Sequence, residues 1–294
     1  MLRRTLAALA ATAVSAALLV APTGGDAVAA PQPAQRKTSW TPAGKATITP
    51  GVMMYTKGAQ CTANFVFTDR RGGVYVGYAA HCAGKGEATD TDGCSTASQP
   101  IGTKVTFVRG GGLVSGGTVI GSGTLAYSSW ITERRIGTTD PQTCAYNDFA
   151  LVKVRPRDVR KVNPSVPVFG GPTGLSTASL GLGDRLYSYG NSSLRGGVEV
   201  LSPKLGVALG DDPADQGWSH PLYSLTPGIP GDSGSGFLTA KGQAIGTLST
   251  VVLAPTPGSN NIGDLAKELR FAQRHSGIPG LRLTRGTVRF DPPA

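Results

Sequence analysis

Apolar residues along this chain recur in short runs in which they alternate with polar residues. The strand-like runs of the N-terminal half are CTANFVF, VYVGYAA, TKVTFV, GTVIGSGTLAY and DFALVKV, and TDRRGG between the first two is typical of a hairpin turn. A polar, proline-bearing stretch at 155–167 separates them from a second set: DRLYSYG, GGVEVLS, LGVAL, SGSGFLTA and QAIGTLSTVVL. Alternation with a period of two predicts strands. The pattern therefore predicts an all-β protein with two groups of strands joined by a linker.

One segment has instead the 3.6-residue period of an amphipathic helix. We expect Asn261 to cap its start, Arg274 and His275 to lie in its last turn, and Gly277 and Pro279 to end it. Its apolar positions are Ile262, Leu265, Ala266, Leu269 and Ala272. The sequence therefore predicts a single helix, which closes the second group of strands.

Residues 1–29 have the pattern of an export signal. Arg3 and Arg4 precede an apolar run that is short for a membrane anchor, and Ala27-Val28-Ala29 supplies small residues for cleavage. The arginine pair leaves both the general and the twin-arginine export routes open. We predict a secreted protein with no membrane anchor after signal removal, a flexible arm or short propeptide at 30–50 and a C-terminal tail at 277–294.

Composition and charge agree with a folded, basic, secreted chain. The 294 residues include 42 glycines and 21 prolines, and hydrophobic residues make up 39% against 16% charged. Without residues 1–29, the chain carries 26 basic and 17 acidic residues. The basic residues are scattered and lack interleaved aromatic residues. We therefore expect a soluble basic surface and no nucleic acid partner, while attraction to anionic substrates or cell walls stays open.

The cysteines predict disulfides rather than a metal site. The four, Cys61, Cys82, Cys94 and Cys144, form an even set in a secreted chain, and three pairings are open. No C-x-x-C or H-x-x-x-H spacing supports zinc. The fragment TDTDGC, which ends at Cys94, lacks the rest of a calcium-binding loop. We expect neither a metal nor an organic cofactor.

Three short motifs contain the residue types that nucleophilic catalysis by serine requires. A serine needs a base to take its proton, and the base needs a group to orient it. Of three histidines, His81 in GYAAHC follows a strand, whereas we expect His220 at the surface and His275 at the helix end. Asp148 in NDFALV precedes a buried strand, and Ser233 lies in GDSGSG. We interpret His81, Asp148 and Ser233 as base, orienting group and nucleophile.

The glycine-rich surroundings of Ser233 also offer an oxyanion hole. Small neighbours allow a tight turn in which the backbone N–H groups of Gly231 and Ser233 point at an incoming carbonyl oxygen. Each well-placed donor contributes roughly 3–4 kcal/mol of transition-state stabilisation.

AAHC, NDFALV and GDSGSG, in the order histidine, aspartate, serine, resemble the chymotrypsin-like (trypsin family) serine proteases, in particular the secreted bacterial members. The resemblance covers roughly residues 51–275. It implies a serine endopeptidase domain at 51–276 made of two six-stranded antiparallel β-barrels, about 51–160 and 161–276, with a C-terminal helix. It also implies a monomer that hydrolyses protein or peptide substrates through an acyl-enzyme intermediate.

The same resemblance implies further residue roles. The resemblance implies a disulfide between Cys61 and Cys82, which leaves Cys94 to pair with Cys144. It places Ser249 beside the buried aspartate. Ser249, Thr250 and Val251 would offer backbone groups to an extended substrate, which would add as a strand. Pro227 would form the base of the specificity pocket.

Three departures from the family pattern change what we expect. The usual GDSGGP is GDSGSG here, so the strand after the nucleophile starts differently. No IVGG-type N-terminus follows a basic residue, so we expect Asp232 to bond internal groups instead of a freed amine. Pro227 stands where trypsin-like members carry an acid. Cleavage after lysine or arginine is therefore not supported, and apolar or small side chains are favoured.

Other classes fit the sequence less well. An α/β-hydrolase esterase could use Ser233, Asp264 and His275 in that order, but GDSGS lacks the G-x-S-x-G elbow and the strand–helix alternation is missing. A subtilisin-like order would need Asp69 before His81, with helices that the pattern does not contain. A catalytically silent protease fold used for binding or adhesion stays open, although all three catalytic residue types are present.

Overall fold

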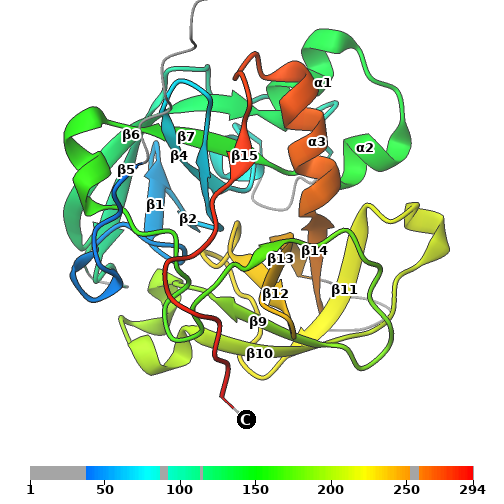
Figure 1. Ribbon diagram of the computed structural model, residues 1–294. Coiled ribbons are helices and arrows are strands. Elements are labelled where there is room, and N and C mark those ends of the chain that lie inside the picture. Colours follow the sequence, from blue (N-terminus) through cyan, green and yellow to red (C-terminus); the bar gives the residue numbers. More distant parts are fainter. Residues whose placement is uncertain (1–37, 87–91, 113–114, 252–257, 294) are drawn as a thin grey trace, which may run out of the picture. The chain divides into compact units, whose positions relative to one another are not determined.

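The strand-like runs of the N-terminal half form one sheet in the computed structural model, which describes residues 38–86, 92–112, 115–251 and 258–293 (Figure 1). Its strands follow the order β15-β3-β4-β7-β6-β5-β1-β2. Only residues 63–65 separate β2, at one end of this order, from β3, the second strand from the other end. The strands are β1 (Met53–Thr56), β2 (Ala59–Thr62), β3 (Val66–Thr68), β4 (Val74–Tyr78), β5 (Lys104–Arg109), β6 (Thr118–Ser128), β7 (Ala150–Val154) and β15 (Arg282–Leu283).

The second sheet closes into a barrel. Its order is β12-β9-β10-β11-β14-β13-β8, and β12 also pairs with β13, which joins six strands in a ring. All pairings are antiparallel except that of β8 with β13. Its strands are β8 (Gly174–Leu175), β9 (Arg185–Tyr189), β10 (Pro203–Ala208), β11 (Ser219–Ser224), β12 (Gly236–Thr239), β13 (Gln243–Val251) and β14 (Asn260–Asp264). The predicted all-β class with two groups of strands is confirmed. Of the two predicted six-stranded barrels, the second is a closed ring of six strands, whereas the first group forms an eight-stranded sheet.

An apolar core joins the two sheets. Phe65, Phe67 and Phe149 from the first sheet pack in the same cluster as Tyr187 and Leu238 from the second. Helix α3 (Leu265–His275) covers this cluster with Leu265, Leu269 and Ala272. Burying such side chains contributes about 1.5–3 kcal/mol each, so the two sheets are stabilised against one another as well as internally.

The predicted helix is present as α3, but it starts later than predicted, and it is not the only helix. Asp264, not Asn261, caps α3: its carboxylate accepts the backbone N–H of Lys267 at 2.7 Å. Asn261 lies in β14, where it pairs with Pro221 and Thr250. Two further helices, α1 (Ser129–Ile136) and α2 (Pro141–Tyr146), follow β6. With 8 and 6 residues, they are too short for the 3.6-residue period to be recognised, which needs a segment of about 11 residues.

Five strands were missed and one was wrongly predicted. The GGVEVLS segment contains a 3-10 turn, η5 (Glu199–Leu201), and three of its apolar residues are exposed: Val198, Val200 and Leu201. The strands that were not predicted are β1, β8, β11, β14 and β15. β11 contains Pro221, which disfavours a central strand, yet β11 pairs on both sides. The remaining 3-10 turns are η1 (Ala43–Lys45), η2 (His81–Ala83), η3 (Pro156–Lys161), η4 (Ser193–Arg195) and η6 (Pro213–Asp215).

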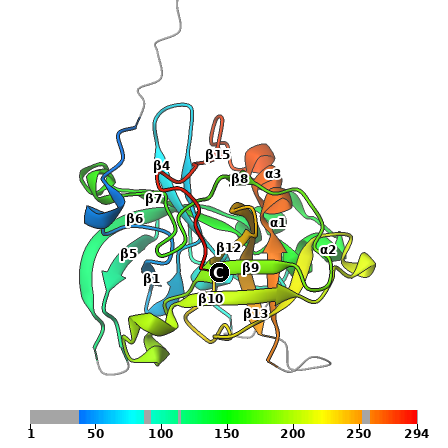
Figure 2. The ribbon, with the colours of Figure 1, turned by 60° about the horizontal axis from the view of Figure 1, so that its bottom comes forward.

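Both ends of the described chain pack on the sheets. Within the predicted arm, Ile48 is fully buried and pairs with Val162 in a β-bridge. In the predicted tail, β15 pairs with β3, and the Phe290 ring lies 5.6 Å from that of Tyr187 on β9. Figure 2 shows this last segment running from β15 across to β9 and β10. The tail therefore contacts both sheets. The predicted signal, residues 1–29, lies outside the described residues.

In the ranges that the structure describes, no helix is long and apolar enough to cross a membrane.

Candidate active site

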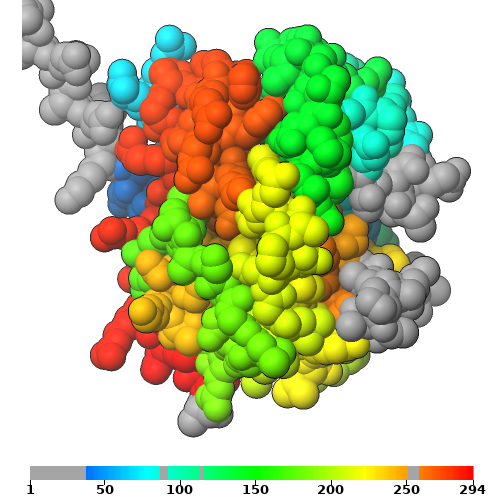
Figure 3. All heavy atoms as spheres, turned by 90° about the vertical axis from the view of Figure 1, so that its right-hand side faces the viewer, coloured from blue at the N-terminus to red at the C-terminus, as the bar shows by residue number. Residues whose placement is uncertain are grey.

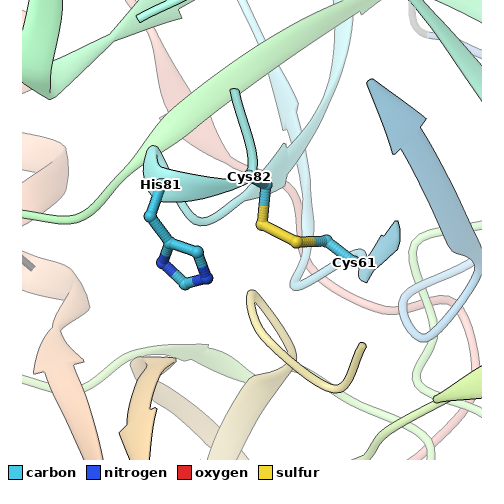
Figure 4. A group of neighbouring side chains, drawn as sticks. All are labelled: Cys61, His81 and Cys82. Carbon is cyan, nitrogen blue, oxygen red and sulfur yellow. A yellow bond between two sulfur atoms is a disulfide. The ribbon is translucent and has the colours of Figure 1, made fainter. Parts of the chain in front are cut away.

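His81 opens the turn η2 directly after β4 and is held beside a disulfide. Cys82 is bonded to Cys61 on β2, which fixes the backbone next to the imidazole (Figure 4). Ligand atoms of Cys61, His81 and Cys82 all lie within 4.8 Å of one another. Both sulfurs are in the disulfide, however, so neither is a thiolate that could bind a metal.

Asp148 binds His81 from the start of β7. Its Oδ2 lies 2.6 Å from His81 Nδ1, and its Oδ1 accepts the His81 backbone N–H at 2.8 Å. The Ser249 hydroxyl donates to the same Oδ2 at 2.6 Å. Asp148 is buried, with 1% of the residue exposed. The geometry fixes the ring and leaves Nε2 as the nitrogen available for proton transfer.

The electrostatics of this pair match its geometry. Burial disfavours the charged imidazole, but the Asp148 carboxylate outweighs burial, so the pKa of His81 is raised. Burial likewise opposes the Asp148 charge, but His81 and the Ser249 hydroxyl outweigh it and lower the pKa of Asp148. Each group therefore stabilises the charged form of the other.

Ser233 lies in a loop that is tied to both sheets. Its carbonyl accepts the Thr62 backbone N–H at 2.8 Å and lies 4.0 Å from Cys82 Sγ, next to His81. The following residue, Gly234, donates its N–H to the Leu248 carbonyl at 2.7 Å, one residue before Ser249. The loop that contains Ser233 is thus anchored beside the residues that hold His81 and Asp148.

The turn before Ser233 requires glycine. Gly231 has φ +96°, and a Cβ atom there would lie 2.1 Å from Gln60 Oε1. Its carbonyl accepts hydrogen bonds from Gln60 Nε2 at 3.0 Å and Thr62 Oγ1 at 2.8 Å, which fixes the peptide. Within the described part of the chain, the N–H groups of Gly231 and Ser233 have no acceptor. These are the two donors that the sequence assigned to an oxyanion hole.

Two internal cations neutralise Asp232, the residue before Ser233. Lys204 Nζ lies 2.9 Å from Asp232 Oδ2, and Arg195 Nη2 donates to the same oxygen. Asp232 and Lys204 are both fully buried, and Arg195 is 10% exposed. The backbone N–H of Ser192 also donates to Asp232, at 3.1 Å. Asp232 therefore bonds internal groups, as the missing N-terminal motif led us to expect.

Lys204 and Arg195 hold the neighbouring loop as well. The Pro227 carbonyl accepts from Arg195 Nη2 at 2.9 Å and from Lys204 Nζ at 3.4 Å, and the Thr226 carbonyl accepts from Lys204 at 3.0 Å. The segment 226–232 is thus attached to β10 and η4. Neither cation could be identified from the sequence, since neither lies in a motif.

The residues predicted to bind substrate lie in two segments, the loop at 226–232 and the strand β13. The Pro227 side chain is exposed, while its carbonyl faces the two cations. Ser249, Thr250 and Val251 are consecutive on β13, and the latter two pair with Asn261 and Asn260. Ser249 is therefore shared between β13 and the Asp148 site.

Two buried glutamates lie close enough to Asp148 to interact with its charge. Glu133 on α1 and Glu268 on α3 are fully buried, and no cation lies within 4.0 Å of either carboxyl among the described residues. Burial, and next the Asp148 charge, raise the pKa of Glu133 to about 9. The same two causes raise the pKa of Glu268 well above its usual range. Glu133 is therefore a neutral acid near pH 7, and burial favours the neutral form of Glu268 in the same way.

We expect Glu133→Gln to stabilise the protein increasingly as pH rises from 5 to 9. The folded chain keeps the Glu133 proton up to about pH 9, whereas the unfolded chain loses it near 4.5. Between these values the wild type loses up to about 1.4 kcal/mol of unfolding free energy per pH unit. Glutamine does not titrate. Urea unfolding at each pH measures the difference. The prediction would be contradicted if the difference in unfolding free energy between variant and wild type stayed constant with pH, or if the exposed-site control Glu199→Gln showed the same change.

The second disulfide joins Cys94 to Cys144 on α2, so both pairs are those that the resemblance implied. Asp92, Cys94 and Cys144 lie close together, but the disulfide again removes the thiolates. The carboxylate of Asp92 accepts the N–H groups of Cys94 and Ser95. Residues 87–91, which include the first half of the TDTDGC fragment, lie outside the described residues.

His220 is not at the surface, so that prediction was wrong. It is 2% exposed, with Nδ1 2.7 Å from Asp211 and Nε2 3.1 Å from Asp264. These carboxylates outweigh the opposing effect of burial and raise the pKa of His220. Because Asp264 binds His220 and caps α3, it is not available to His275 at the other end of the helix. Figure 3 shows this face, where the β11 region lies against α1–α2 and α3.

Solved structures of bacterial serine proteases share this fold. Protease A of Thermobifida fusca has a TM-score of 0.50 and 16% identity over 82% of this chain and 100% of that one. A Nocardiopsis protease matches at 0.46 and 18%, over 80% and 98%. Cellulomonas bogoriensis chymotrypsin matches at 0.43 and 16%, over 81% and 98%. No family model and no curated protein sequence matches the chain. The fold is therefore chymotrypsin-like, as the motifs implied, and at this identity the likeness is one of fold.

Proposed function

We propose that this protein is a secreted serine endopeptidase with His81, Asp148 and Ser233 as its catalytic residues. The observation that carries the proposal is the hydrogen-bonded chain from Ser249 through Asp148 to His81, beside a Ser233 loop anchored at Thr62. The chymotrypsin-like fold supports it, since in that fold a histidine from one barrel and a serine from the other meet in the cleft between the two barrels.

The proposed reaction is acyl transfer. His81 Nε2 takes the hydroxyl proton of Ser233 as Oγ attacks the scissile carbonyl carbon. Asp148 stabilises the imidazolium that forms, and the N–H groups of Gly231 and Ser233 bind the oxyanion. His81 then protonates the leaving amine, and water hydrolyses the acyl-enzyme by the same steps in reverse. No step requires a metal or an organic cofactor.

The substrate we propose is a protein or peptide in extended form. Ser249, Thr250 and Val251 would pair with it as an added strand. Pro227 in place of an acid favours an apolar or small side chain before the scissile bond. The enzyme would act as a monomer.

The proposed organisation follows from the sequence. Residues 1–29 would be removed on export, and the two disulfides are typical of an oxidising, extracellular compartment. The protease domain would span 51–276, with barrels at about 51–160 and 161–276 and a tail at 277–294. Since Lys204 and Arg195 already neutralise Asp232, formation of the Ser233 loop would not need a freed N-terminal amine.

Labelling with a fluorophosphonate probe tests the nucleophile directly. We expect the native chain and the exposed-serine control Ser179→Ala to be labelled equally, and Ser233→Ala not to be labelled. The reason is that only an activated serine hydroxyl reacts at a useful rate. Labelling that persists in Ser233→Ala would refute the assignment. A folded native chain that is not labelled would favour a silent binding module.

A further inference from the structure

A basic hollow lies on the first sheet and on the segment that follows β7. Its volume is about 380 Å³, and η3, β6 and the first residue of β5 line it. By water's share of liquid volume, this is room for roughly a dozen water molecules, enough for a segment of a chain rather than one ion. The charged residues of its lining are Lys104, Arg155, Arg157, Asp158, Arg160 and Lys161.

Only one of the five cations in this lining is neutralised. Asp158 is 4% exposed, and its carboxylate accepts from Lys161 Nζ at 2.7 Å and from the Ser122 N–H at 3.1 Å. The charge of Lys161 is thereby balanced. Lys104, Arg155, Arg157 and Arg160 are exposed, and no carboxylate of the described chain lies within 4.0 Å of them. Their four positive charges therefore face the solvent together.

The framework that carries these cations is fixed. The Arg155 N–H donates to the Ser122 carbonyl at 3.1 Å, and Lys161 Nζ donates to the Ile120 carbonyl at 2.6 Å. The Lys161 carbonyl accepts the N–H groups of Thr47 and Ile48, both at 3.0 Å. The turn η3 is thus attached to β6 on one side and to residues 47–48 on the other, so ligand binding needs little ordering of the backbone.

We propose that this hollow is an exosite for a linear polymer of sulfate or phosphate groups. Guanidinium groups match tetrahedral oxyanions with paired hydrogen bonds, and three of the four uncompensated cations are arginines. The lining contains no aromatic residue on which a nucleic acid base could stack. A polyanion without bases, such as a sulfated polysaccharide or inorganic polyphosphate, therefore fits better than a nucleic acid.

Such a site would retain the protein on an anionic matrix while leaving the Ser233 region free. It is independent of the proposed catalytic activity, because none of its residues belongs to the Ser233 region. It also gives a role to the basic residues at 155–161, which lie in the stretch that the sequence predicts as a linker.

The test measures the affinity of the Ser233→Ala chain, in which the proposed catalysis is removed, for heparin, polyphosphate and single-stranded DNA at several salt concentrations. We expect heparin, polyphosphate or both to bind. Combined Arg155→Gln, Arg157→Gln and Arg160→Gln should weaken binding about 10- to 100-fold and reduce the slope of log Kd against log salt by about two.

The matched control removes three exposed arginines elsewhere: Arg270→Gln, Arg274→Gln and Arg285→Gln. If the control variant loses as much affinity as the exosite variant, the effect is one of net charge alone and the proposal is overturned. Unchanged affinity in the exosite variant would also overturn it. Whichever of heparin and polyphosphate binds identifies the source of the oxyanions. DNA that binds more tightly than both through the same arginines would overturn the choice of ligand. If the triple variant unfolds, the single variants Arg157→Gln and Arg160→Gln replace it.

Discussion

Replacing Asp148 by asparagine is expected to lower kcat by about 10⁴-fold. The Asp148 carboxylate accepts hydrogen bonds from His81 Nδ1, the His81 backbone N–H and the Ser249 hydroxyl. An amide has one oxygen fewer to accept them, and an NH₂ group facing Nδ1 favours the wrong tautomer of the ring. Loss of the carboxylate also removes the interaction that raises the pKa of His81, so the remaining activity should titrate at a lower pH.

Hydrolysis of a labelled protein substrate across pH measures this effect. The control is Asp140→Asn, which makes the same chemical change at the exposed cap of α2 and should leave the rate within about twofold. A rate for Asp148→Asn within tenfold of the wild type, or a pH profile that does not move, would mean that His81 is not oriented by Asp148.

Replacing Asp232 by asparagine is expected to reduce the free energy of unfolding by about 3–5 kcal/mol. The change leaves Lys204 and Arg195 close together in the interior with no negative partner. Lys204 already has a lowered pKa, mainly because of burial, so it would lose its proton in the variant at a pH where it now keeps it. Lys204→Met should cost less, because Arg195 still neutralises Asp232.

Urea unfolding in the Ser233→Ala background, which avoids self-digestion, measures both variants and their combination. If Asp232 and Lys204 interact as the 2.9 Å contact indicates, the double variant should be less destabilised than the two single effects added together. Additive effects would show that the two residues stabilise the fold separately.

The sequence was sufficient to predict the all-β class and to recognise the three motifs, because both depend on short stretches of neighbouring residues. AAHC and NDFALV each place a polar residue at the end of a buried run, which is where β4 and β7 present His81 and Asp148. The capping and the number of the helices were not predictable in the same way. Asn261 has the chemistry of a cap, but pairing of β14 with β11 and β13 extends the strand to Asp264.

Lys204 shows why the charged interior could not be predicted. In β10, hydropathy alone would direct Leu205 and Val207 inward and the lysine outward. The structure has the opposite register: Lys204 is fully buried, whereas Leu205 and Val207 are 36% and 46% exposed. Asp232, twenty-eight residues away in sequence, reverses the preference, since it offers a charge partner that a local pattern does not contain.

The C-terminal segment has a consequence for the order in which the protein is made. β15 completes the edge of the first sheet, and the Thr284 and Thr68 hydroxyls, 216 residues apart in sequence, meet at 3.5 Å. During synthesis the first sheet lacks this edge strand until the C-terminal segment is made, and contacts so distant in sequence form slowly. We expect a chain still on the ribosome to lack the packing that joins the two sheets. A destructive activity would then arise only after translation has passed residue 283.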